Sequence, residues 1–320
     1  MTTRLEGMTT ADSAVTPSIA YPLRSIGRLT VTPLGLGAMP LSFEDKADDT
    51  HNARATVGAA LDAGITLIDT ADIYAPAWNK VGHNERQVAD ALEAYAAAHP
   101  DFDRASITVA TKGGITRAEG EQWGRDSSVG HFRTAVVRSK KNLGVETIDL
   151  YYLHRPDRTR LYSEAIETLA ELKDEGHVKN IGISNASVEE IEIALEVLGE
   201  GNLAAVQNEF SPRFNHTSWD ELKFCGEHGI TFVPWSPLGG TGGGAAEVGE
   251  RFPAIAEISR NRKVSPQQVV LAWEMSLGDH VLPIPGASRP ASIADSAKAM
   301  SLTLDAGEKD ALDKELLPKR

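Results

Sequence analysis

Short apolar segments alternate with longer segments of helical periodicity along most of this 320-residue chain. In the longer segments apolar residues recur every three or four positions, as with Val88, Leu92 and Tyr95, a spacing typical of amphipathic helices. Strands joined by helical crossovers predict an α/β fold with a parallel sheet, and eight strands are the number in a closed (β/α)8 TIM barrel. The eight candidate strands are residues 34–39, 66–69, 107–112, 148–154, 180–184, 204–209, 231–235 and 281–285.

Helix boundary signals support this alternation. Ser187 is followed three residues later by Glu190, which predicts a capping box. Ser265 precedes Pro266 at an expected first helical position. Gly64 follows an apolar periodic segment at a place where a helix end favours a left-handed residue.

The rival architecture is a doubly wound sheet, which usually has a glycine-rich phosphate turn that opens a helix after its first strand. Here the segment LGLGAMPLS leads into a polar loop instead, so the barrel is favoured. We expect a flexible leader over residues 1–22 and one barrel domain over residues 23–320. An N-terminal β-hairpin that plugs the barrel floor and a C-terminal helical extension complete the predicted fold. Residues 237–251 are rich in glycine and predict a long mobile rim loop.

The composition of the chain limits the kinds of partner that it can bind. The formal charge of −13 disfavours binding to nucleic acid and to an anionic membrane surface. No apolar run approaches the ~20 residues of a membrane span. Cys225 is the only cysteine and is predicted to be an inert packed thiol, so the chain contains no disulfide pair. These features favour a cytoplasmic protein.

Four polar residues lie at or just beyond predicted strand ends: Asp69, Tyr74, Lys112 and His154. The carboxyl ends of barrel strands face one rim, where these side chains would meet. A tyrosine near an ammonium group releases its proton more easily, and an imidazole can hydrogen-bond and orient a carbonyl. Each residue alone could equally be a loop cap, a packed ring or a surface group. Together they predict a site that protonates a carbonyl during hydride transfer.

The motifs IDTADIY, VATKGG, YYLHRPD, GISN, VQNEFSP, PWSPLGG and IPGASRP occur in this order. In content and order they resemble the aldo-keto reductases, over roughly residues 24–300. The resemblance implies a (β/α)8 barrel that binds NADPH along its rim without a Rossmann domain. It also implies that Asp69, Tyr74, Lys112 and His154 are the catalytic tetrad, with Tyr74 as the acid.

Candidate cofactor-binding residues follow the later strands. Ser184, Asn185 and Gln207 offer hydroxyl and amide groups that suit the carboxamide of nicotinamide, although they could also be ordinary turn residues. The Trp235 ring could stack on the nicotinamide or pack in the core; the family usually has tyrosine here. Backbone N–H groups of the following loop suit a pyrophosphate. The residues expected there are Ser236, Pro237, Leu238 and Gly239.

Ser288 and Arg289 lie near the start of the last predicted barrel helix, where a helix N-terminus and a guanidinium would clamp a 2′-phosphate. This favours NADPH over NADH; the alternative is a solvated surface arginine. Many relatives then carry an arginine and a Glu-Asn pair near the adenosine. The corresponding residues here are Ser292, Asp295 and Ser296, so one carboxylate, Asp295, persists among the predicted cofactor-binding residues.

Trp78 and Trp123 are the candidate walls of a substrate pocket, and Met39, Phe210 and Arg213 are weaker candidates. The predicted function is an NADPH-dependent reductase of aldehydes or ketones that acts as a monomer or small oligomer on a small carbonyl substrate. The alternative is a cofactor-binding regulatory or redox-sensing subunit with slow turnover. A metal-dependent barrel enzyme ranks last, because no His/Asp/Glu cluster has convincing ligand spacing, and we predict no metal.

Overall fold

A computed structural model describes residues 21–43, 45–240 and 243–318. Its centre is a curled sheet of seven parallel strands in the order β11-β10-β9-β8-β5-β4-β3. The strands are β3 (Leu36–Gly37), β4 (Leu67–Asp69), β5 (Thr108–Gly113), β8 (Ile148–Leu153), β9 (Val178–Ser184), β10 (Leu203–Gln207) and β11 (Thr231–Phe232). Strand β5 is buried along its whole length, as expected for a parallel sheet covered on both faces.

Residues 281–286 join the two edges of this sheet. Val281 bridges Phe232 on one edge and Gly286 bridges Gly37 on the other, both in parallel orientation. The predicted eighth strand is therefore reduced to isolated bridges. Pro283 and Pro285 explain this, because they lack the N–H groups that a ladder with β3 would need. On this side only their carbonyl groups form hydrogen bonds: Pro283 accepts from the N–H of Gly35 and Pro285 from the N–H of Gly37, both at 3.0 Å.

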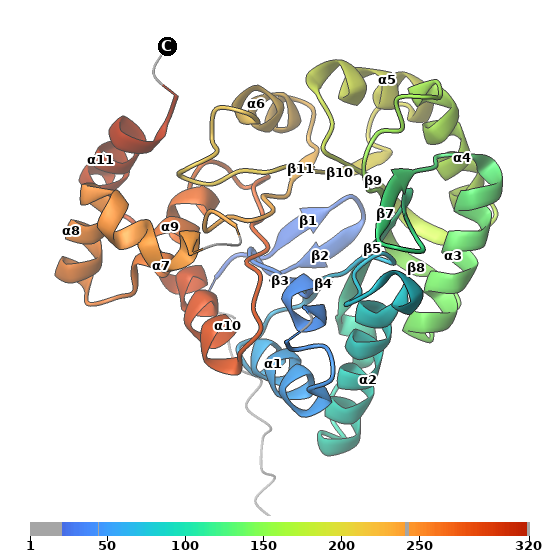
Figure 1. Ribbon diagram of the computed structural model, residues 1–320. Coiled ribbons are helices and arrows are strands. Elements are labelled where there is room, and N and C mark those ends of the chain that lie inside the picture. Colours follow the sequence, from blue (N-terminus) through green and yellow to red (C-terminus); the bar gives the residue numbers. More distant parts are fainter. Residues whose placement is uncertain (1–20, 44, 241–242, 319–320) are drawn as a thin grey trace, which may run out of the picture.

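Helices cover the outside of the curled sheet (Figure 1). In the described part of the chain they are α1 (Thr50–Asp62), α2 (His83–Ala98), α3 (Val129–Leu143), α4 (Tyr162–Asp174), α5 (Val188–Leu198), α6 (Trp219–Glu227), α7 (Gly244–Arg251), α8 (Pro253–Arg262), α9 (Pro266–Met275), α10 (Pro290–Ala297) and α11 (Ala306–Leu316). Two large apolar clusters involve these helices, and a third contains sheet and hairpin residues. Since strands and helices alternate, the sequence prediction of an α/β fold is confirmed.

The first two strands, β1 (Arg24–Ile26) and β2 (Leu29–Val31), pair antiparallel as a hairpin. Figure 1 shows this hairpin across the ring of strands. Thr231, at the start of β11, donates its hydroxyl to the Ser25 carbonyl at 2.6 Å. Ile26 and Val31 pack with apolar residues of the sheet. These contacts position the hairpin against the amino-terminal end of the sheet, away from the ends where β4, β5 and β8 lead into the site.

Local signals in the sequence correspond to local structure. Ser187 and Glu190 form the predicted capping box of α5, and Gly64 has a left-handed φ of +83° just beyond α1. Ser265 caps α9 by accepting from the N–H of Gln268. The prediction of a long loop over residues 237–251 was wrong in its second half. Helix α7 begins after Gly243, whose φ of +99° starts it, and buries Val248.

Two further findings concern the periphery. A hairpin of β6 (Ile115–Ala118) and β7 (Gln122–Arg125), which the sequence analysis did not predict, follows β5. Residues 1–20 of the predicted leader lie outside the described residues, and α11 is a further helix after α10. No helix in residues 21–43, 45–240 and 243–318 has the length and apolar character needed to cross a membrane.

Candidate active site

Parallel strand ends gather the four polar residues that the sequence analysis singled out. Asp69 is the last residue of β4, Lys112 lies near the end of β5, and His154 directly follows β8. Tyr74 lies in the loop that leaves β4. Strand β5 pairs with both β4 and β8, so the register brings the three strand ends to one rim.

Lys112 is the centre of the polar contacts at this rim. Its Nζ donates to Asp69 Oδ1 at 2.5 Å and to the Thr70 carbonyl at 2.9 Å, and it lies 3.5 Å from the Tyr74 hydroxyl. The other carboxylate oxygen of Asp69 accepts from Gln207 Nε2 at 2.8 Å. The Lys112 side chain is fully buried, so these contacts hold the ammonium in one place.

Burial and charge set the protonation states of this group. Burial lowers the pKa of Lys112, but Asp69 and Tyr74 together raise it more, so its pKa lies above the ordinary value. Burial raises the pKa of the Tyr74 hydroxyl, and nearby Lys112 opposes that rise without cancelling it. The predicted influence of Lys112 on Tyr74 is therefore present, but burial is the larger effect. Tyr74 is a neutral phenol with a cation beside its oxygen.

His154 faces Tyr74 across the rim. The two ring centroids lie 5.6 Å apart with an interplanar angle of 82°. Burial, with Lys112 and Arg155 as smaller causes, lowers the pKa of His154 well below its ordinary value, so the imidazole is neutral. Its Nδ1 is buried with no hydrogen-bond partner in the described structure. A neutral imidazole beside a phenol can donate a hydrogen bond to a carbonyl oxygen placed between them.

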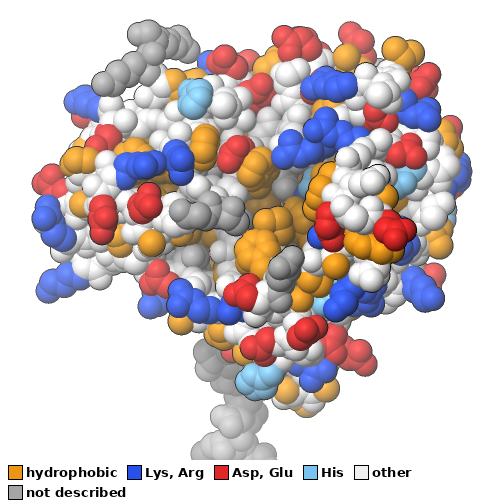
Figure 2. Space-filling view, in the orientation of Figure 1, with side chains coloured by type: hydrophobic (Ala, Val, Ile, Leu, Met, Phe, Trp, Pro, Cys, Tyr) orange, Lys and Arg blue, Asp and Glu red, His pale blue; other side chains and the backbone are white. Residues whose placement is uncertain are grey.

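A cavity of about 440 Å³ opens at this rim. Figure 2 shows a hollow near the middle of the face, with hydrophobic side chains on its walls and basic side chains beside it. Among the predicted site residues, the following line the cavity: Met39, Asp69, Tyr74, Trp123, His154, Ser184, Asn185, Gln207, Trp235, Ser236, Pro237 and Leu238. The fully buried Lys112 lies behind this wall.

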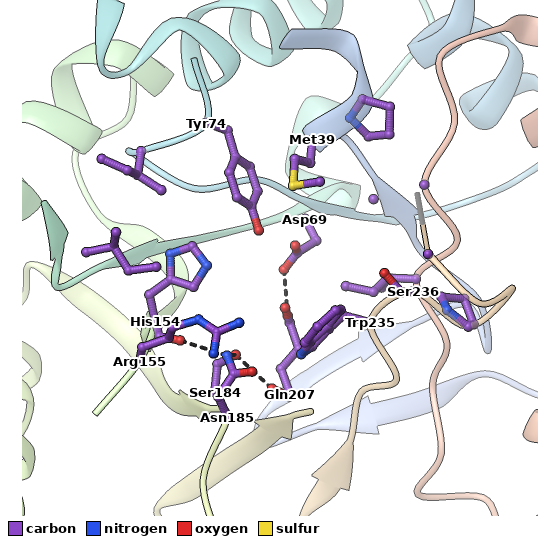
Figure 3. A pocket seen from close by; sticks show the side chains of 18 of the residues that line it. Met39, Asp69, Tyr74, His154, Arg155, Ser184, Asn185, Gln207, Trp235 and Ser236 are labelled. Carbon is purple, nitrogen blue, oxygen red and sulfur yellow. Dashed lines mark hydrogen bonds between the residues drawn. The ribbon is translucent and has the colours of Figure 1, made fainter. Parts of the chain in front are cut away.

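Ser184, Asn185 and Gln207 form a connected polar wall (Figure 3). Ser184 Oγ donates to the Gln207 carbonyl at 2.7 Å, and Asn185 Nδ2 donates to Ser184 Oγ at 2.9 Å. Asn185 also donates to the carbonyl of His154 at 3.1 Å and has a left-handed φ of 59°. A non-glycine residue in this conformation is strained, and such strain often marks functional sites.

The turn after Trp235 follows the same edge of the cavity. Trp235 Nε1 is buried without a hydrogen-bond partner in the described structure. Left-handed φ angles of 52° at Ser236, 91° at Gly239 and 78° at Gly240 fold this turn back on itself. Trp235, Ser236, Pro237, Leu238 and Gly240 therefore line one side of the cavity.

Gly239 is not among the residues that line the cavity, and neither are three predicted cofactor-binding residues at or near α10: Ser288, Arg289 and Asp295. Ser288 accepts from Asn52 Nδ2 through its carbonyl at 2.7 Å, and Arg289 is the N-cap residue of α10. Asp295 accepts from Ser265 Oγ at 2.5 Å and from Gln268 Nε2 at 2.6 Å. These two contacts bind Asp295 to helix α9. A cofactor role for the three residues remains a prediction.

The aromatic candidates separate in the structure. Trp123 of β7 is 59% exposed and lines the cavity, with the Arg117 guanidinium 4.6 Å from the centroid of its ring. Trp78 does not line the cavity, and its backbone N–H donates to the Glu121 side chain. Phe210 is fully buried in the core against Trp273, and Arg213 borders a separate small hollow under α7. Of the weaker candidates only Met39 reaches the cavity.

Several lining residues were not singled out from the sequence. Arg155 directly follows His154, and Ile73 directly precedes Tyr74, so proximity to a tetrad residue was an available signal for both. Ile115 comes from the unpredicted β6–β7 hairpin and offered no such signal. No group of three or more His, Cys, Asp or Glu side chains suited to a metal occurs among the residues the structure describes.

Known protein families and sequences match this chain over nearly its whole length. The aldo/keto reductase family model matches residues 33–316. An uncharacterized oxidoreductase of Schizosaccharomyces pombe is 30% identical over 310 residues, covering 96% of this chain and 94% of that protein. A 6-dehydroglucose reductase of Novosphingobium aromaticivorans is 32% identical over 280 residues, covering 86% of this chain and 88% of that protein.

The three-dimensional structure is also similar to solved structures over nearly the whole chain. The crystal structure of an aldo-keto reductase from Klebsiella pneumoniae in complex with NADPH superposes with a TM-score of 0.76 at 24% identity. It covers 95% of this chain and 97% of the Klebsiella chain. At this identity the superposition supports the fold, whereas the family model and the sequence relatives establish ancestry. The chain belongs to the aldo/keto reductase family.

Proposed function

We propose that this protein reduces aldehydes or ketones to alcohols with NADPH, and that Tyr74 is the general acid. One observation carries the proposal: the Tyr74 hydroxyl lies at a cavity wall, 3.5 Å from the buried Lys112 ammonium and opposite the His154 ring. A phenol in this setting can give a proton to a substrate oxygen and leave its own negative charge beside a fixed cation.

The four residues then have separate tasks. His154 donates a hydrogen bond to the carbonyl oxygen and orients it toward Tyr74. NADPH, when bound, supplies the hydride that reaches the carbonyl carbon. Tyr74 gives its proton to the oxygen, and Lys112 stabilises the phenolate that remains. Asp69 holds Lys112 in position through the 2.5 Å contact.

The residues around the cavity fit this cofactor. The face of Trp235 would stack on the nicotinamide ring, and the polar wall of Ser184, Asn185 and Gln207 would contact its carboxamide. The backbone N–H groups of Ser236 and Leu238 would contact the pyrophosphate. Pro237 has no N–H, and the N–H of Gly239 donates to the Ser236 carbonyl at 2.9 Å. The orphaned indole N–H of Trp235 is a free donor at this place. The NADPH complex of the Klebsiella relative supports the choice of cofactor.

We also propose that residues 23–320 form one domain, a closed (β/α)8 barrel whose floor is covered by the β1–β2 hairpin. The bridges of residues 281–286 to both edge strands support closure. The buried position of Cys225, whose pKa is raised by burial, supports an inert thiol. A cytoplasmic location remains part of the proposal.

The substitution Tyr74→Phe tests the mechanism. It removes the proton donor and retains the ring, so we expect NADPH consumption with aldehydes or ketones to fall by about 100-fold or more. Because the ring keeps its packing, the affinity for NADPH, measured by fluorescence titration, should stay within about twofold. Tyr95→Phe is the matched control, since its hydroxyl contacts exposed Asp62 on the outside of the barrel.

Unchanged turnover in Tyr74→Phe would contradict the assignment of the acid. Tight binding of NADPH by the unaltered protein without turnover of any carbonyl compound would instead favour a regulatory or sensing subunit. Failure to bind either nicotinamide nucleotide would contradict the cofactor.

A further inference from the structure

Arg155 directs a guanidinium into the cavity beside His154 (Figure 3). It is half-buried, and its side chain takes part in none of the hydrogen bonds or ion pairs of the described part of the chain. A guanidinium has five N–H donors, and leaving them without a partner away from water is unfavourable. The Arg155 guanidinium can therefore donate hydrogen bonds to an acceptor on a bound molecule.

Neighbouring arginines are already engaged, which distinguishes Arg155 from them. Arg125 donates to the carbonyl of Pro156 at 3.1 Å. Arg117 donates to the carbonyl of Ala75 at 2.6 Å, and it pairs with Glu121. Both have partners supplied by the fold. Among the described side chains that line the cavity, Arg155 is the only cation.

The carboxylates nearby do not neutralise it. Asp69 lines the cavity, but its oxygens are taken by Lys112 and Gln207. Glu209 is close enough to raise the pKa of Arg155, yet it forms no ion pair with it. Arg125 acts in the opposite direction, and burial is the largest cause of the lowered pKa of Arg155. An anion that enters the cavity would relieve this half-buried charge.

We propose that Arg155 binds a carboxylate on the substrate, so that the preferred substrates are carbonyl compounds that carry a carboxylate. This inference rests on the proposed reductase function and narrows its substrate class. The planar guanidinium matches a carboxylate in a bidentate pair. Ile73, Ile115 and Trp123 on the walls are uncharged, and the Arg117 guanidinium behind Trp123 is already paired with Glu121. This arrangement suits one negative charge.

The adjacency of His154 and Arg155 gives the site its selectivity. His154 orients the carbonyl oxygen while Arg155 holds the carboxylate, so both ends of a short substrate are fixed by consecutive residues. A neutral compound of the same shape would leave the guanidinium unpaired and would gain only the contact at His154. Selectivity for the anion then shows in kcat/KM, since the pairing persists in the transition state.

The test compares 4-carboxybenzaldehyde with its methyl ester, two aldehydes of similar shape that differ in charge. The unaltered enzyme should favour the acid in kcat/KM by roughly 10- to 100-fold, the range of a charge-assisted hydrogen bond. Arg155→Gln should bring the ratio close to one, and Arg155→Lys should retain part of it. Glu209→Gln should raise the ratio, because it removes a competing negative charge.

Arg133→Gln is the control. This arginine lies on α3, where it pairs with Glu171 of α4 and with Glu175 directly after α4. Its ratio should equal that of the unaltered enzyme. The same ratio in Arg155→Gln as in the unaltered enzyme would overturn the proposal. So would a tenfold loss of NADPH affinity in Arg155→Gln at an unchanged ratio, since the arginine would then belong to the cofactor site.

A binding experiment separates this proposal from the proposed function. Calorimetry measures benzoate and benzamide binding to the protein with NADP⁺ at two salt concentrations. If neither aldehyde is reduced, the reductase function fails, and the anion site is still judged here. Benzoate binding that weakens with salt and is lost in Arg155→Gln supports the site. Equal binding of benzoate and benzamide overturns it.

Discussion

Glu274 of helix α9 is a carboxyl group with both oxygens buried and neither hydrogen-bonded in the described structure. Burial raises its pKa well above the ordinary value, so the native protein keeps this group protonated. In the unfolded chain it ionises near its ordinary pKa of about 4.3. Its contribution to stability is therefore fully present below that pH, and it is lost as pH rises toward the folded pKa.

Glu274→Met should remove this pH-dependent loss, because it replaces the carboxyl with an apolar side chain of similar size. The stability difference between the variant and the unaltered protein should grow from pH 5 to pH 8, by at most about 1.4 kcal/mol per pH unit. Urea unfolding at both pH values measures it. Glu167→Met, at an exposed position of α4, should give a difference that does not change with pH. A pH-independent difference for Glu274→Met would contradict the prediction.

Residue-scale prediction from the sequence succeeded where backbone direction determines proximity. Asp69, Lys112 and His154 follow parallel strands, so their meeting followed from the strand assignment. Arg289 lies outside the cavity lining, and its predicted contact with a 2′-phosphate stays a prediction, because its place depends on how α10 packs after residues 281–286. That packing is a long-range property that no local pattern records.

At the scale of elements, α3 is tied to the loop that carries Tyr74. Arg138 of α3 donates to Asp72 Oδ2 at 2.8 Å, and Asp72 is fully buried two residues before Tyr74. Burial, and to a smaller extent the nearby Glu85, raise the pKa of Asp72, and Arg138 lowers it; the net pKa is about 7. The arginine therefore keeps a buried carboxylate compatible with the fold.

Arg138→Met should leave that carboxyl without its cation. The loss of stability should reach roughly 3 kcal/mol at pH 8 and be smaller at pH 5, where Asp72 is neutralised by a proton. The sign follows from the raised pKa, because a protonated native carboxyl loses stability as pH rises. Arg133→Met on the same helix should cost less than about 1 kcal/mol. Equal losses at both pH values in urea unfolding would argue against this coupling.

Elements were predictable where local chemistry determines them and not where context does. The capping box at Ser187 and the left-handed Gly64 follow from short-range hydrogen bonds and backbone sterics. Helix α7 was missed because glycine-rich sequence disfavours helix, whereas burial of Val248 stabilises it. The strand predicted over residues 281–285 is only a set of isolated bridges in the structure. Its two prolines interrupt hydrogen bonding only with the neighbouring strand that their nitrogen atoms face, and the sequence does not show which strand that is.

At the scale of the whole molecule, the sheet closes at a seam between Gly37 and residues 284–286. A Cβ at Gly37 would lie 2.9 Å from the carbonyl oxygen of Ile284 and 3.3 Å from Gly286 Cα. Gly37→Ala should therefore push the seam apart and lower the free energy of unfolding by about 1–3 kcal/mol. Gly130→Ala is the counterpart: its Cβ would meet open space within α3, and the change should stabilise by about 0.5–1 kcal/mol. Chemical denaturation of both variants measures this; a stable Gly37→Ala protein would show that the seam yields.

The same seam bears on how the protein is made. Residues 281–286 bridge β3 and β11, and they follow all seven strands of the sheet in the sequence. While the ribosome is still synthesising them, the growing polypeptide exposes two unpaired parallel edges, which are templates for association with other chains. The nascent sheet therefore keeps both edges unpaired until residues 281–286 are made, and a premature stop before residue 281 would release a sheet without the bridges between its edges.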